Sequence, residues 1–286
     1  MTHLPVTKTH KLFIGGTFPR SESGRSVRVT SDAGTWHVCR ASRKDLRIGV
    51  EAARGAQRSW ADASASLRGQ ILYRLGEMME GKGQELARAL LVGVDGADVA
   101  GATREVESAI DRVIYYAGWC DKYAQIAGCA NPVAGAYHNF TVPEPVGVVG
   151  VVCPDECPLL GLVSLVAPAV CVGNTCVVLA SEGNPIPACV LCESIGTSDL
   201  PRGVVNVLTG LRDELVPHFA SHREINAIHG ANLEAGHEVT LREGVGENLK
   251  RVTLRAHADF FDPRCESPGW IDPLVNLKTL WHPSAT

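Results

Sequence analysis

The stretch that decides the fold of this chain is residues 146–152, with the sequence Val-Gly-Val-Val-Gly-Val-Val. It contains no polar residue, so neither face of the segment is marked for contact with water. A short run that is apolar on both faces is typical of a strand in a parallel sheet covered by helices on both sides. We therefore predict a buried strand here and look outward for its partners.

Toward the C-terminus, short apolar strands alternate with helical patterns. The further strands are predicted at 175–179, 204–208, 225–229 and 251–255, and the helices at 158–171, 187–196, 212–221 and 232–243. This alternation predicts a doubly wound, five-stranded parallel sheet over residues 146–256. Right-handed crossovers place the carboxyl ends of all five strands at one edge, where such sheets bind ligands.

Toward the N-terminus, the pattern changes to that of a helical layer. A hairpin of two short strands is predicted at Leu12–Phe18, hinged on Gly15-Gly16. Helical periodicity follows at 45–59, 66–81, 84–94 and 103–127, so that residues 11–130 form a hairpin and helical layer. Between this layer and the sheet, within residues 131–145, Tyr137–Val142 is predicted to be an exposed strand.

After Ala256 the alternation of strands and helices ends. Prolines interrupt the remaining residues at Pro263, Pro268, Pro273 and Pro283. Because proline stops helices and cannot donate to a sheet ladder, we expect 257–286 to be an irregular tail that packs on the domain in pieces. Trp270 and Trp281 are candidates to cover apolar surface.

Composition excludes several classes of partner. The 286 residues carry a net charge of −4 without a basic block, which argues against nucleic acid. No apolar run approaches the roughly 20 residues of a membrane span, and the N-terminus lacks the apolar core of a signal peptide. We therefore expect a cytoplasmic protein with reduced thiols at its ten cysteines.

Four segments, taken in order, resemble the cofactor domain of the aldehyde dehydrogenase superfamily. They are Glu144–Gly150, Ala167–Thr175, Pro201–Gly210 and Asn248–Leu254. Within that superfamily, Val152–Leu160 and Lys278–Pro283 are most similar to the degenerate C-terminal domain of family 16. The resemblance implies a Rossmann-like, NAD-binding-type domain in a shortened copy that lacks the catalytic domain.

The resemblance also implies that the catalytic positions are lost. The family's nucleophilic cysteine would follow the last residue of this chain, and its general base corresponds to Arg255, which cannot accept a proton. The family's oxyanion-binding asparagine corresponds to Glu156, whose carboxylate would repel a developing oxyanion. We expect Asp155 and Glu156 to cap the following helix instead, and Cys265 to be an ordinary tail cysteine. No catalytic residue is assigned.

Cofactor positions are only partly retained. By resemblance, the residues that could contact a dinucleotide are Glu182, Gly210, Gly230 and Gly236. The family's ribose-binding lysine is replaced by Leu179, and a glycine two places after Gly210 is replaced by Arg212, which would crowd the adenosine. A surface position is expected for Arg212, with a phosphate contact as the alternative. We thus expect no cofactor, with NAD as the alternative.

Metal binding has weak support. Cys189 and Cys192 form a CxxC inside a helical pattern, and His218 and His222 share a helix face, but no further ligand accompanies either pair. No metal site is assigned.

Three functions follow as hypotheses. The first is a catalytically inactive, aldehyde dehydrogenase-like pseudoenzyme that binds a protein partner or a second copy of itself near Tyr137–Val142. The alternatives are an NAD(P)-binding domain or subunit of an aldehyde oxidoreductase, and a non-catalytic dinucleotide sensor.

Overall fold

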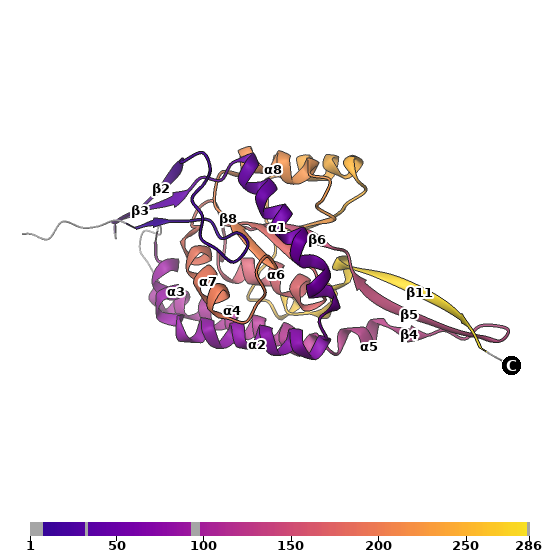
Figure 1. Ribbon diagram of the computed structural model, residues 1–286. Coiled ribbons are helices and arrows are strands. Elements are labelled where there is room, and N and C mark those ends of the chain that lie inside the picture. Colours follow the sequence, from indigo (N-terminus) through magenta and orange to yellow (C-terminus); the bar gives the residue numbers. More distant parts are fainter. Residues whose placement is uncertain (1–7, 32–33, 93–97, 285–286) are drawn as a thin grey trace, which may run out of the picture.

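A five-stranded parallel sheet forms the centre of the computed structural model, which describes residues 8–31, 34–92 and 98–284 (Figure 1). Its strands are β6 (Val148–Val152), β7 (Thr175–Leu179), β8 (Val205–Leu208), β9 (Ala227–Ala231) and β10 (Arg251–Arg255). The spatial order is β10-β9-β6-β7-β8, with all neighbours parallel. The predicted doubly wound sheet is confirmed, and its order reverses between β6 and β9.

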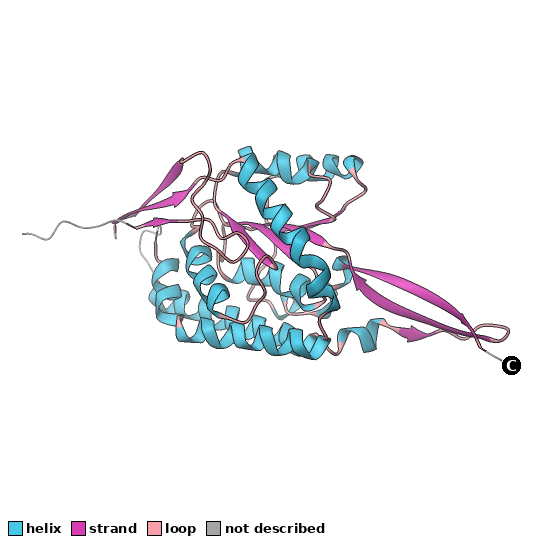
Figure 2. Ribbon diagram, in the orientation of Figure 1, coloured by secondary structure: helices cyan, strands magenta, loops and turns pink. Residues whose placement is uncertain are grey.

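Helices cover both faces of this sheet, as Figure 2 shows. One face is covered by α1 (Arg43–Asp62), α8 (Arg212–Ser221) and α9 (Ala235–Glu243), and the other by α6 (Leu160–Cys171) and α7 (Ile186–Thr197). Every residue of α6 is buried, because α6 lies between the sheet and an outer helical layer. These two layers explain why every residue of β6 and β7 is buried.

The outer layer packs against α6 and α7. It consists of α2 (Ala65–Gly81), α3 (Gly83–Leu90), α4 (Val99–Trp119) and the short α5 (Tyr123–Ala127). The helices predicted at 66–81, 84–94 and 103–127 thus lie in this layer, although residues 93 and 94 lie outside the described residues. The helix predicted at 45–59 is α1, which covers the opposite face of the sheet, so the prediction of a single helical layer within 11–130 is wrong at that helix. Among the described residues, no helix is long and apolar enough to cross a bilayer.

The N-terminal hairpin predicted at Leu12–Phe18 is present in a minimal form, closed by two backbone hydrogen bonds between Ile14 and Thr17. Leu12–Phe18 forms a turn with single bridges from Phe13 to Val207 and from Ile14 to Thr17, and Gly15 and Gly16 supply its positive φ angles. A second, longer hairpin that the sequence analysis did not predict is formed by β2 (Ser26–Ser31) and β3 (Gly34–Cys39), beside the short β1 (Thr9–His10). The polar sequence of β2 and β3 hid this hairpin from an analysis based on apolar runs.

A three-stranded arm projects from the body of the molecule (Figure 1). It contains β4 (Cys129–Ala130), β5 (Tyr137–Pro145) and β11 (Val275–Pro283), and the antiparallel register joins Val275 to Pro145 and Pro283 to Tyr137. The prediction of an irregular tail over 257–286 is therefore wrong for 275–283. Pro283 is compatible with this strand because it is the terminal residue of an edge strand.

The rest of the tail packs against α4 and the start of α5 in short turns. These are η2 (Pro263–Cys265), η3 (Pro268–Trp270) and η4 (Asp272–Leu274). The buried guanidinium of Arg112 donates to the carbonyls of Phe260 and Cys265, both at 3.0 Å, and Tyr116 Oη donates to the carbonyl of Ser267 at 3.1 Å. These side chains hold the tail in place between β10 and the arm.

Candidate functional site

The candidate site lies at the carboxyl edge of the parallel sheet, where the turns after β6, β7 and β8 meet. Arg212, the first residue of α8, extends its side chain from the end of β8 to the turn after β6. Its Nη1 donates to Asp155 Oδ2 at 2.5 Å, and its Nη2 donates to Asp155 Oδ1 at 2.8 Å and to the carbonyl of Cys153 at 2.6 Å. A bidentate arginine–carboxylate pair of this kind fixes the orientation of both side chains.

Asp155 also accepts hydrogen bonds from the turn after β7. Its Oδ1 also accepts from Ser181 Oγ at 2.8 Å and from the backbone N–H of Gly183 at 2.9 Å. Burial alone would raise the pKa of Asp155, but the hydrogen bonds from Arg212, Gly183 and Ser181 outweigh it and hold the pKa below its usual value. Asp155 is therefore ionised and paired at neutral pH.

The start of α6 is capped by a residue other than the two that were predicted. Glu105 of α4 accepts from the backbone N–H groups of Leu159 and Leu160 at 2.9 and 3.1 Å, so the capping role assigned to Asp155 and Glu156 is wrong. Burial raises the pKa of Glu105, and the two backbone donors oppose this shift. The cap comes from a residue about 55 positions earlier in the chain, which a local sequence pattern cannot reveal.

The four predicted cofactor residues do not gather at one point. Glu182 lies in the turn after β7 and accepts from the backbone N–H of Arg212 at 2.6 Å, and Gly210 lies nearby, after β8. Gly230 lies inside β9, where a Cβ would approach Leu233 and Leu254 at 3.1 Å, and Gly236 is exposed in the first turn of α9. Glu182 and Gly210 thus share the edge with Arg212, and dinucleotide contacts by any of the four stay a prediction.

These side chains do not fit a dinucleotide lying across the edge in the observed arrangement. Doubly wound sheets bind dinucleotides outside the carboxyl ends of their strands, near the point where the strand order reverses. Here Arg212, only 9% exposed, occupies the space between the ends of β8 and β6, and the surface position expected for it is wrong. The first turn of α9 is also engaged, because His237 Nε2 contacts Asp213 Oδ1 at 2.8 Å.

Arg255, at the position that resembles the family's general base, is half-buried between the sheet and the tail. Its Nε donates to His229 Nε2 at 3.2 Å, and its guanidinium carbon lies 3.9 Å from the centroid of the Trp270 ring. His229 is fully buried, and its burial and the Arg255 charge lower its pKa to about 3, although the hydrogen bond between its Nδ1 and the carbonyl of Leu165 opposes this shift. Arg255 thus fastens the tail to the sheet through His229 and Trp270.

Cys265 has the surroundings of a structural cysteine. It is buried in the tail, its Sγ donates to the carbonyl of Asp259 at 3.1 Å, and burial raises the pKa of its thiol. Because the thiolate is the nucleophilic form, a raised pKa disfavours attack on a carbonyl.

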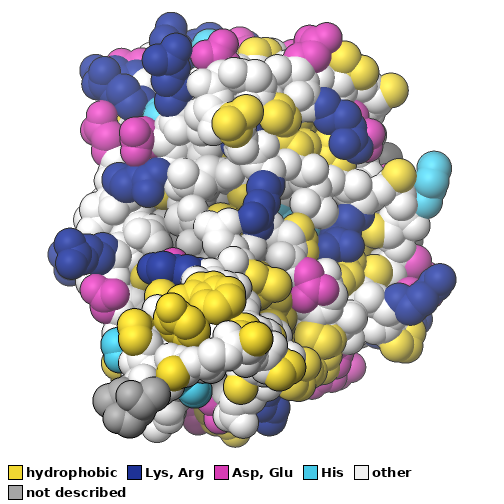
Figure 3. All heavy atoms as spheres, turned by 90° about the vertical axis from the view of Figure 1, so that its right-hand side faces the viewer, with side chains coloured by type: hydrophobic (Ala, Val, Ile, Leu, Met, Phe, Trp, Pro, Cys, Tyr) yellow, Lys and Arg dark blue, Asp and Glu magenta, His cyan; other side chains and the backbone are white. Residues whose placement is uncertain are grey.

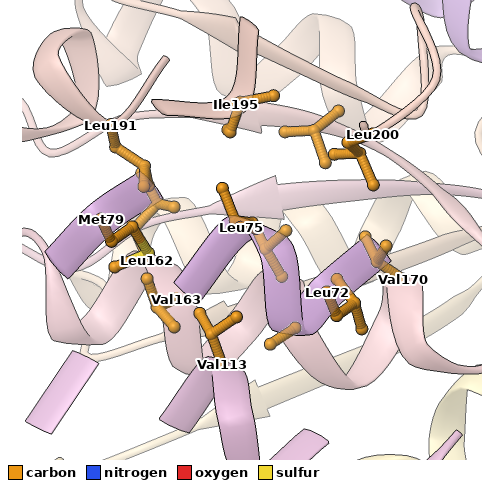
Figure 4. A pocket seen from close by; sticks show the side chains of 13 residues that line it. Leu72, Leu75, Met79, Val113, Leu162, Val163, Val170, Leu191, Ile195 and Leu200 are labelled. Atoms are coloured by element: carbon orange, nitrogen blue, oxygen red, sulfur yellow. The ribbon is translucent and has the colours of Figure 1, made fainter. Parts of the chain in front are cut away.

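An apolar gap and the histidines offer no second site. The gap, of about 30 Å³, lies between α2, α4, α6 and α7, and Figure 4 shows aliphatic side chains and one methionine pointing into it. It lacks the polar groups that orient a ligand. His218 and His222 do not belong to any group of three metal-ligating side chains within the described parts of the chain.

The Arg212–Asp155 pair is the feature that the sequence analysis missed. Its signal was available: two residues of opposite charge follow two strands whose carboxyl ends share an edge. The intervening strand β7 separates them in the sheet, so the pairing depends on the length of the arginine side chain.

Comparison with known proteins places this fold in a family. The model of the aldehyde dehydrogenase family matches residues 20–257, and the chain belongs to that family. Retinal dehydrogenase 2 of Mus musculus is 35% identical over 255 residues, which cover 86% of this chain and 48% of the relative. Aldehyde dehydrogenase, cytosolic 1 of Elephantulus edwardii is 30% identical over 264 residues, which cover 90% of this chain and 52% of the relative.

Solved structures agree with this assignment. The NAD+ complex of an aldehyde dehydrogenase from Bacillus cereus superimposes with a TM-score of 0.82 at 27% identity, covering 87% of this chain and 51% of that one. The chain thus spans about half the length of the relatives that it matches.

Proposed function

We propose that this chain is a non-catalytic aldehyde dehydrogenase-like domain that acts by protein association, with a second copy of itself as partner. The similarity to the C-terminal domain of family 16 and a cytoplasmic location are parts of this proposal. The observation that carries it is the arm, whose apolar face has no covering element among the described residues.

The arm combines two features of an association surface. Tyr137, Leu277 and Trp281 are 49%, 62% and 59% exposed, and the rings of Tyr137 and Trp281 meet edge to face with centroids 5.8 Å apart. Figure 3, which views the molecule from the arm end, shows hydrophobic side chains gathered on the arm. In addition, β11 is an edge strand of nine residues with pairing on one side. Long exposed edges of this kind pair readily with another chain.

The absence of catalysis is supported by the residues at the sheet edge. Arg255 is engaged with His229 and Trp270, and Glu156 places a carboxylate where the resemblance implies an amide donor. Neither can perform the chemistry that the family's motif implies for its position.

The test is a native mass measurement, with NAD-dependent oxidation of a simple aldehyde followed in the same sample. We expect a dimer or higher oligomer without turnover, and a monomer for the double variant Leu277→Ser/Trp281→Ser. The control is Val99→Ser/Val239→Ser, which removes two exposed apolar side chains of α4 and α9, outside the arm, and should leave the mass unchanged.

Three results would count against the proposal, the third from a calorimetric measurement of NAD binding on the same sample. A monomeric wild-type chain contradicts association through the arm. Turnover supports the alternative of an oxidoreductase domain, and turnover that survives Cys265→Ala places the nucleophile elsewhere. Tight NAD binding without turnover supports the dinucleotide sensor, an alternative favoured by the similarity to the Bacillus cereus NAD+ complex.

A further inference from the structure

A side chain of the protein itself, that of Arg212, lies across the carboxyl edge of the sheet. We propose that the Arg212 side chain, held by Asp155, is a latch that closes the cleft in which this edge would otherwise bind the adenosine half of a dinucleotide. The inference concerns the edge alone and does not depend on association through the arm.

The first step of the argument is geometric. Arg212 lies at the start of α8, after β8, yet its guanidinium bonds to Asp155 and Cys153 beyond the end of β6. Because β7 lies between these two strands, the side chain spans the edge over the end of β7. A ligand lying across the same strand ends would have to displace it.

The second step concerns what the latch leaves in place. Glu182 accepts from the backbone N–H of Arg212, so this bond does not require the arginine side chain. The start of α8 and the turn after β7 therefore stay joined when residue 212 is changed. The obstacle is the side chain, and the backbone that frames the cleft is independent of it.

The third step concerns charge. The guanidinium neutralises Asp155, whose side chain is 45% exposed. Removing Arg212 alone would leave an uncompensated carboxylate at the edge, which would repel the phosphates of a dinucleotide. Opening the cleft therefore requires changes at both residues, with asparagine keeping the shape of Asp155 and its acceptor oxygen for Ser181 or Gly183.

The experiment measures NAD binding by calorimetry. We expect Asp155→Asn/Arg212→Gly to bind NAD about tenfold or more tightly than the wild type. Asp155→Asn/Arg212→Met, which removes the same charges but keeps a long side chain across the edge, should bind no better than the wild type. Arg40→Ala removes a partner of Glu214 on the same helix α8, and it should also leave binding unchanged.

Circular dichroism and thermal melts establish that each variant is folded, and Asp155→Asn/Arg212→Ala replaces the glycine variant should that one fail to fold. The latch is refuted by a folded glycine or alanine variant that binds no better than the wild type. Equal binding by the methionine variant also refutes it, because the bulk of residue 212 would then be irrelevant. Wild-type binding of NAD as tight as that of Asp155→Asn/Arg212→Gly would likewise refute the latch.

Discussion

The carboxyl edge of the sheet and the arm differ in how their side chains are partnered within the chain: those at the edge are hydrogen-bonded, and those on the arm are exposed and apolar. At the edge, Arg212, Asp155, Ser181 and Glu182 bond to one another or to nearby backbone across three strand ends. On the arm, Leu277 and Trp281 present most of their apolar surface to solvent, and β11 pairs along one side.

A partner can therefore bind to the arm at a lower free-energy cost than to the carboxyl edge. A ligand at the edge must first break a charged pair and replace its hydrogen bonds. A protein at the arm displaces only water from apolar surface and from an open strand edge. In this chain, paired side chains fill the edge of the sheet where such folds bind nucleotides, whereas the surface of the arm is exposed.

The junction between the sheet and the arm should show the largest effect. Asn174 is fully buried: its Oδ1 accepts from the N–H of Gly147 at 2.9 Å, and its Nδ2 donates to the carbonyls of Ala169 and Leu274 at 3.1 and 3.0 Å. Asn174→Ala leaves these groups unpaired, so we expect the free energy of unfolding to fall by about 2–4 kcal/mol. Urea unfolding measures this loss.

Asn276→Ala is the matched control, since Asn276 is an exposed residue of the arm that accepts one bond from Arg251 at 2.6 Å. Its cost should stay below about 0.5 kcal/mol. Equal losses in the two variants would mean that the arm is not fastened to the sheet at Asn174.

Apolar periodicity predicted the parallel sheet well because burial itself determines that pattern. The strands 175–179 and 251–255 were located at their observed bounds. Polar strands such as β2 were not predicted, because a half-exposed hairpin lacks a continuous apolar run. β11 escaped because its register depends on β5, about 140 residues earlier in the chain. At the edge, the sequence indicated that Arg212 would crowd a nucleotide, but its pairing with Asp155 required the order of the strands.

Beneath the edge, His229 should make stability depend on pH. Its pKa is lowered to about 3 by burial first and then by Arg255, whereas the unfolded chain has an ordinary histidine near pKa 6.5. The unfolded state therefore binds the proton first as the pH falls. The free energy of unfolding should decrease below about pH 6.5, by roughly 1.4 kcal/mol per pH unit, and so by about 2 kcal/mol at pH 5.

Urea unfolding between pH 7 and pH 4.5 measures this slope. In His229→Gln, the number of protons taken up on unfolding should be lower by about one, so the slope should be correspondingly smaller. His218→Gln is the control, because His218 is a partly exposed residue of α8 whose pKa burial lowers by less. Parallel slopes for the wild type and His229→Gln would show that His229 is accessible to protons in the folded chain.

On the open side of the comparison, the arm's own ion pair should contribute least. Lys278 Nζ bonds to Glu144 Oε1 at 3.0 Å with both side chains about half exposed, so Lys278→Ala should change the free energy of unfolding by less than about 0.5 kcal/mol. The same substitution at Lys250, whose Nζ donates to three carbonyls at the end of α8, should cost about 2–4 kcal/mol. A loss above about 1 kcal/mol at Lys278 would make the arm part of the cooperative core.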